Sequence, residues 1–271
     1  MATSNVNQPV FNPADFVPGQ PIDNKYLPWK PGTTFVYDTY LPGNVLEQID
    51  TVTVTTATKK IDGVICTVVS DNVTDPKTGA LIEKTDDYYA QDKSGNVWYF
   101  GEASVASVNG KLIDKSGSWL AGIQGALPGI IQEANPQVGD SYDEENAPNV
   151  AHDHGQVISL KGSASVPFGT FKHDLLVTHE TSLLEPGAAE NKYYAAGIGE
   201  VFGVDLVSGE EDRLVSVTPA PGTAAATNVS QLVQSMAGFG ASGGGLDSGL
   251  MPVAANESGL SHILAVHAHH G

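Results

Sequence analysis

The chain has 271 residues, and its 41% hydrophobic content is close to that of a globular protein, so one large β domain or two small ones can bury a core. Its 31 acidic residues against 13 basic ones give a net charge of −18. That field repels phosphate groups, which excludes nucleic acid and anionic membrane surfaces as favoured partners.

Residues 1–32 are rich in proline and lack periodicity, which predicts an extended arm laid over a domain. The N-terminus has no charged start followed by an apolar run, so we do not expect an intact signal peptide there. No segment approaches about 18 consecutive apolar residues, and we therefore expect no membrane insertion.

Residues 33–218 show short alternating runs, such as IDTVTVTTAT, separated by turn residues roughly every 8–14 positions. This pattern predicts an all-β fold, an antiparallel meander that forms an open or closed barrel (lipocalin-like) or a sandwich. The single cysteine, Cys66, excludes an intramolecular disulfide and is expected as a buried thiol in a strand. The single arginine, Arg213, is expected to pair with Glu210, Glu211 or Asp212.

Two stretches inside the β region depart from the alternation. The segment 117–136, GSWLAGIQGALPGIIQEANP, is apolar, rich in glycine and contains Pro128, which favours a loop crossing over the sheet. In GDSYDEE, the carboxylates of Asp140, Asp143, Glu144 and Glu145 cluster. We expect a solvated acidic loop there, with a calcium site as the alternative.

The composition changes after residue 218. Residues 219–271 are rich in Gly, Ala and Ser and contain no lysine or arginine. They predict a flexible tail with one short amphipathic helix over 228–239, separate from the β domain or loosely attached to it. Such a composition is typical of an export signal or an assembly element.

One late segment carries a resemblance. Tyr193, Tyr194, Ala195, Ala196, Gly197, Ile198 and Gly199 resemble the Tyr-Tyr-Ala-Pro-Gly-Val-Gly segment of uncharacterised secreted or periplasmic bacterial β-proteins, with Ala196 in place of the usual proline. The resemblance covers roughly residues 30–205, together with WKPGTTFVYDTY and DKSGNVWYFGE. It implies an antiparallel barrel outside the bacterial cytoplasm and carries no catalytic residue.

A His-Asp-His motif suggests a metal site. In a strand, His152 and His154 project from one face with Cα atoms about 6.6 Å apart, and Asp153 points the other way. First-row metal ions need a third ligand. If Lys161-Gly162 is the hairpin turn, a bulge near residues 167–169 brings His173 opposite His152.

Other histidines are weaker candidates for that site. His179 lies further along the strand, and His267, His269 and His270 belong to the tail. The alternative is that the motif is an exposed strand end with satisfied polar groups. The candidate cofactor is one divalent transition metal, zinc or copper, and no other cofactor is indicated.

The aromatic residues of the strands suggest a second kind of site. Tyr88, Trp98, Phe100 and Tyr193 are core or rim residues by default, but at an open barrel mouth they would line a ligand pocket. No nucleophile–base arrangement is recognisable, so catalytic residues are unknown. We therefore predict an exported binding, structural or assembly protein, whose partner is a small ligand or a second copy of itself. The alternative is a metal-dependent hydrolase or lyase that uses the histidines.

Overall fold

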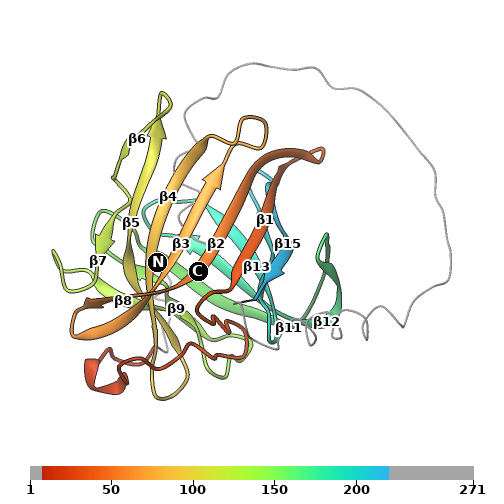
Figure 1. The fold of residues 1–271 in the computed structure, drawn as a ribbon. Coiled ribbons are helices and arrows are strands. Elements are labelled where there is room, and N and C mark those ends of the chain that lie inside the picture. The colour runs from red at the N-terminus through yellow and green to blue at the C-terminus, as the bar shows by residue number, and fades with distance from the viewer. Residues whose placement is uncertain (1–7, 220–271) are drawn as a thin grey trace.

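The computed structural model describes residues 8–219, and these are almost entirely strand (Figure 1). The one helical element in this range is a short 3-10 turn, η1 (Pro13–Asp15). The strands are β1 (Thr34–Leu41), β2 (Val45–Ile61), β3 (Val64–Thr74), β4 (Leu81–Gln91), β5 (Val97–Val108), β6 (Lys111–Asp114), β7 (Trp119–Leu120), β8 (Leu127–Gln132), β9 (Ser141–Asp143), β10 (Glu145–Asn146), β11 (Asp153–Val166), β12 (Gly169–Ser182), β13 (Ala189–Ala195), β14 (Gly199–Asp205) and β15 (Glu211–Thr218).

The strands form one antiparallel sheet with the order β10-β8-β5-β4-β3-β2-β1-β15-β14-β13-β12-β11-β9. Consecutive strands are neighbours from β1 to β5 and again from β11 to β15, and the first strand pairs with the last. Two-residue turns with positive φ at both positions, Asp62-Gly63 and Asn109-Gly110, join strands in this meander. Such turns match the twist of the strands that they connect. The predicted all-β antiparallel barrel is therefore confirmed.

The segment 141–146, which we call the seam, nearly closes the barrel. Its first half, β9, pairs with β11, and its second half, β10, pairs with β8. Between them, the N–H of Glu144 donates to the carbonyl of Asp153 at 2.8 Å. A Cβ at Gly129 of β8 would lie 2.1 Å from the carbonyl oxygen of Glu144, so only glycine permits this approach. One short piece of chain thus joins both edges of the sheet.

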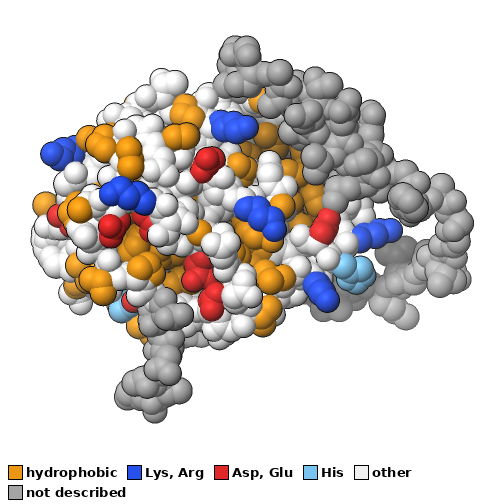
Figure 2. Space-filling view, turned by 90° about the horizontal axis from the view of Figure 1, so that it is seen from below, with side chains coloured by type: hydrophobic (Ala, Val, Ile, Leu, Met, Phe, Trp, Pro, Cys, Tyr) orange, Lys and Arg blue, Asp and Glu red, His pale blue; other side chains and the backbone are white. Residues whose placement is uncertain are grey.

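The N-terminal arm covers one end of the barrel. Phe11 and Phe16 pack against the outward-facing rings of Trp98 and Phe100, with ring centroids 5.5–6.0 Å apart. Further along, Asn24 donates to carbonyls beside the β4–β5 turn and beyond β8. The carbonyl of Lys25 accepts from the N–H of Gly197 in the β13–β14 turn. The arm therefore crosses between opposite walls, at the lower end in Figure 1. Figure 2 views the molecule from that side and shows hydrophobic side chains gathered among scattered charged ones.

Two local predictions are wrong. Residues 117–136 are not a loop throughout, because they contain β7 and β8. Ile130 and Ile131 are buried in the wall, and Pro128 is tolerated because it lies beside the short partner β10 near the edge. The hairpin turn is also not at Lys161-Gly162, since β11 continues to Val166. Gly162 lies instead at a register shift, where a Cβ would meet Val177 at 2.4 Å.

Three features of the sequence complete this description. Cys66 is buried as predicted, and burial raises the pKa of its thiol to about 12. Arg213 pairs with Glu211, also as predicted, at 2.8 Å from Nε to Oε2. Within residues 8–219, no helix has the length and apolarity needed to cross a membrane. The predicted tail helix and the tail histidines lie outside the described residues.

Candidate functional site

A cavity of about 390 Å³ opens into the barrel at the end opposite the one crossed by Asn24 and Lys25 of the arm. Its walls include Ala189 and Glu190 at the start of β13, whereas the arm contacts the turn that follows the other end of this strand. Carboxylates dominate the lining, with Glu102, Glu144, Glu145, Asp153, Glu180, Glu185, Glu190 and Asp205. Strand alternation explains this convergence, since side chains two residues apart share a face and here that face is inward.

The deepest carboxylates come from separate elements. Glu102 projects from β5 and Glu180 from β12, while Glu145 belongs to the seam; all three are buried. The indole N–H of Trp119 donates to Glu145 Oε1 at 3.1 Å, and the hydroxyl of Thr178 donates to Glu180 Oε1 at 2.7 Å. These contacts fix the acidic side chains inside the barrel. The carboxylates of the cavity come from six strands, β5, β10, β11, β12, β13 and β14, and from the connections between them, so no continuous segment contains the site.

The buried cation at this site is Lys192. Its Nζ lies 2.9 Å from Glu180 Oε2 and 4.0 Å from Glu190 Oε2, and its side chain is 1% exposed. Burial lowers the pKa of Lys192, but Glu180, Glu190 and Glu200 outweigh it and raise the pKa well above its usual value. The ammonium group therefore stays charged, and it balances only part of the negative charge around it.

Acidic side chains continue through the rest of the interior, where burial favours their neutral form. Burial, and then the neighbouring carboxylate of Asp71, raises the pKa of Asp50 well above its usual value. Burial likewise raises the pKa of Glu200, against the lowering effect of Lys192. Tyr99 donates its hydroxyl hydrogen to Asp87 Oδ1 at 2.7 Å. Burial disfavours the charged form of a carboxyl group, and an approaching positive group favours it, so a cation would be accommodated here more readily than an anion.

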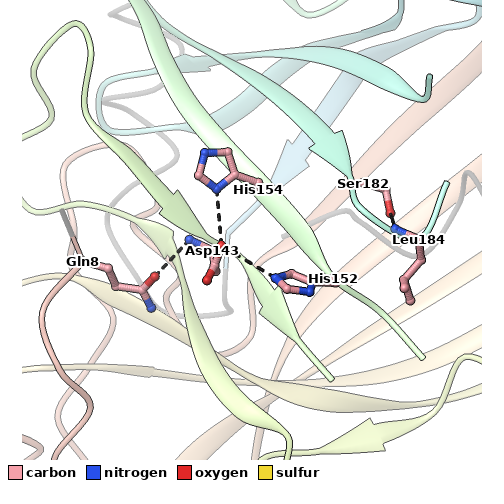
Figure 3. A network of polar contacts seen from close by, with 6 residues as sticks. All are labelled: Gln8, Asp143, His152, His154, Ser182 and Leu184. Carbon is pink, nitrogen blue, oxygen red and sulfur yellow. Dashed lines mark hydrogen bonds and ion pairs between the residues drawn. The ribbon is translucent and has the colours of Figure 1, made fainter. Parts of the chain in front are cut away.

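The histidine pair does not line the cavity. Both imidazoles are directed at Asp143 of the seam (Figure 3). His154 Nδ1 is 3.3 Å and His152 Nε2 is 3.9 Å from the same oxygen, Asp143 Oδ1. As predicted, Asp153 points the other way, and it lines the cavity. Gln8 of the arm accepts from the N–H of Asp143 at 2.9 Å, which ties this corner to the N-terminus.

The structure does not bring His173 to this pair. His173 lies near the far end of the β11–β12 hairpin, where its N–H donates to Ser163 Oγ at 2.9 Å. Since β11 pairs His154 with Thr181, His173 is several residues away along the strand. His179 is held by Asn191 Oδ1 at 2.9 Å. Among residues 8–219, no group of three or more His, Cys, Asp or Glu side chains has the geometry of a metal site.

The predicted solvated acidic loop is also wrong in part. Glu144 and Glu145 are buried and line the cavity, while Asp143 faces the histidines. Asp143 faces the histidine pair, whereas the next two residues, Glu144 and Glu145, both line the cavity, so the acidic run is divided between two places. For this reason the four carboxylates of GDSYDEE do not converge on one calcium ion.

The four aromatic residues proposed for a pocket lie elsewhere and do not line this cavity. Trp98 and Phe100 are covered by the arm. Lys59 Nζ lies 4.0 Å from the ring centroid of Tyr88, and Tyr193 packs on Phe202 at 5.2 Å between centroids. Sequence reasoning missed the carboxylates that do line the cavity. A signal was present for Glu180, which alternates with the buried Leu176 and Thr178 of the same strand.

Comparisons with known proteins find similarity only among solved structures. No protein-family model matches the chain, and no curated protein does. The chain is similar to a Bacteroides fragilis protein named as a candidate exported protein with a YmcC-like fold (12% identity, covering 75% of this chain and 99% of that one, TM-score 0.43). It is also similar to a candidate lipoprotein of Parabacteroides distasonis (14% identity, 72% and 99%, TM-score 0.42). At such low scores the fold rests on the strand pairing of this chain itself.

Proposed function

We propose that this protein is an exported binding protein whose barrel takes a small organic cation into the cavity. The observation that carries the proposal is the acidic cavity of about 390 Å³ that opens into the barrel. Ligand sites in proteins are concave and measure about 300–1,000 Å³. The export part of the proposal rests on the resemblance of residues 193–199 to secreted and periplasmic β-proteins.

The charge balance of the cavity favours an organic cation over other ligands. Eight carboxylates line the walls, and the buried cation Lys192 is already paired with Glu180 and Glu190. Taking a carboxylate out of water costs several kcal/mol unless a positive group compensates it. A bound ammonium group would supply that compensation. The space exceeds what a metal ion needs, so an organic ligand fits it better.

Calorimetric titration of the purified protein with 1,4-diaminobutane tests the proposal, with 1,4-butanediol and succinate as probes of similar size. We expect the diamine to bind and the other two not to bind. Glu145→Gln should weaken diamine binding about tenfold or more, since a buried charge pair contributes more than 1.4 kcal/mol. This variant retains an oxygen that can accept from Trp119.

Glu47→Gln is the matched control, because Glu47 lies on β2 and is not part of the cavity lining. We expect this variant to bind the diamine as the unaltered protein does. Equal binding of diol and diamine, or equal loss in both variants, would contradict the proposal.

A further inference from the structure

Exposed apolar side chains lie at the mouth of the acidic cavity and in the connections next to it. Val150, Leu183, Leu184, Leu206 and Val207, which we call the apolar rim, are all exposed, with Leu183 at 64% and Val207 at 71%. They come from three connections, β10–β11, β12–β13 and β14–β15. Isolated apolar residues are common on protein surfaces, but a group of them around one opening marks a contact surface.

Backbone contacts hold the three parts of the apolar rim together. Val150 and Leu184 line the cavity directly. The N–H of Leu206 donates at 2.8 Å to the carbonyl of Ala189, a cavity residue, and the N–H of Leu183 donates at 2.9 Å to the carbonyl of His152. Asp205, at the cavity wall, accepts from the N–H of Val207 at 2.7 Å. Val150 and Leu184 therefore lie beside the carboxylates at the opening, and the backbone of the other three residues contacts or adjoins cavity residues.

We propose that the ligand of this cavity is an amphipathic cation, an alkylammonium whose charged group lies among the buried carboxylates while its alkyl chain contacts the apolar rim. The inference rests on the proposed function and adds the chemical class of the ligand. Burial separates the two regions, since Glu102, Glu145 and Glu180 are buried whereas the apolar rim is exposed. A purely polar polyamine would leave the apolar rim in water, and a fatty acid would bring a carboxylate into a negative field.

The test compares three probes by calorimetry on the full chain: n-octylammonium, n-propylammonium and 1-octanol. One buried methylene contributes about fourfold in affinity, so half burial of the additional methylenes should make octylammonium bind about 30-fold more tightly than propylammonium. Octanol should bind far more weakly than octylammonium, because it brings no charge to the carboxylates.

Variants of the apolar rim make the test specific. Val150→Asn with Leu184→Asn, two residues of the apolar rim that line the cavity, should lower octylammonium affinity about tenfold and propylammonium affinity by a much smaller factor. Leu112→Asn with Ile113→Asn is the matched control, because these residues are exposed on β6 and do not line the cavity. Both variants replace exposed side chains, and unchanged circular dichroism will verify that they fold.

The outcomes separate this inference from the proposed function. Equal affinities for the two amines, or an unaltered octylammonium affinity in the apolar-rim variant, would overturn the amphipathic ligand while leaving a cation-binding cavity. Octanol binding as tightly as octylammonium would overturn the role of charge. Failure of both amines to bind would overturn the proposed function itself.

Discussion

Replacing Lys192 by methionine should strongly destabilise the protein. The ammonium group of Lys192 lies 2.9 Å from Glu180 and 4.0 Å from Glu190 in the barrel interior. With an effective dielectric constant of about 20, these separations correspond to attractions of about 6 and about 4 kcal/mol. The desolvation of all three groups offsets most of this. Removing one partner of a buried pair nevertheless costs about 3–5 kcal/mol, because the remaining charge loses its compensation.

The loss of stability in Lys192→Met should depend on pH, and the dependence comes from the neighbouring carboxyl groups. Lys192 itself contributes equally at pH 5 and pH 8. Its pKa is raised, so its contribution to stability is complete below its ordinary pKa of about 10.4 and is lost only at still higher pH. The carboxylates behave differently. Glu200, whose pKa is already raised by burial, loses the lowering effect of Lys192 in the variant. Its neutral form then stabilises the fold at low pH, and the variant should lose less stability at pH 5 than at pH 8.

Urea and thermal unfolding at both pH values measure this effect. At pH 8 we expect the Tm of Lys192→Met to fall by about 10 °C, since each kcal/mol corresponds to about 2–4 °C for a domain of this size. Lys161→Met, at an exposed site on β11, is the matched control and should change stability by less than about 0.5 kcal/mol. Adding Glu180→Gln should recover part of the loss. Equal effects of the two lysine variants, or a loss that is the same at pH 5 and pH 8, would refute the reasoning.

Two other predictions concern the seam and its surroundings. Burial, and then Asp140, raises the pKa of Glu133 to about 7, so its neutral form stabilises the fold at acidic pH and this contribution disappears as the pH rises through about 7. Glu133→Gln should therefore flatten the fall in urea midpoint between about pH 5 and 8, and an unchanged slope would contradict this role. For the histidine pair, two imidazoles without His173 predict only weak zinc binding. Zinc titration should show that His152→Ala with His154→Ala removes it and that His173→Ala does not, whereas unchanged affinity in the double variant would assign the metal elsewhere.

Local sequence patterns were sufficient for the elements and for the direction of many side chains. Alternation placed His152 and His154 on the side opposite Asp153 without knowledge of the partners of that strand. The Asp62-Gly63 turn depends on the same kind of local chemistry, because the tight turn needs positive φ at both residues. Burial of Cys66 and the pairing of Arg213 were also predicted from adjacent residues.

Local patterns failed where close approach between distant segments decides the structure. Pro128 and the glycines around it indicated a loop, but Gly129 lets β8 approach Glu144 closely enough to close the barrel. Gly162 also indicated a turn, because glycine is common in turns. In the structure it lies within the hairpin and makes room for the side chain of Val177. In both places glycine serves a tertiary contact and not a change of chain direction.

The sequence by itself determined an antiparallel all-β chain, because a period of two and the turn residues express short-range sterics. Only the tertiary structure decided which face is inside and which strands meet. The inward face carries Asp50, Glu102 and Glu180, which inverts the usual assumption that polar residues face water. Glu102 and Glu180 come from β5 and β12, so their meeting at one cavity depends on pairings between strands far apart in the chain. No local pattern specifies which distant strands pair, because loop closure and long-range packing select these pairings only when the whole barrel forms.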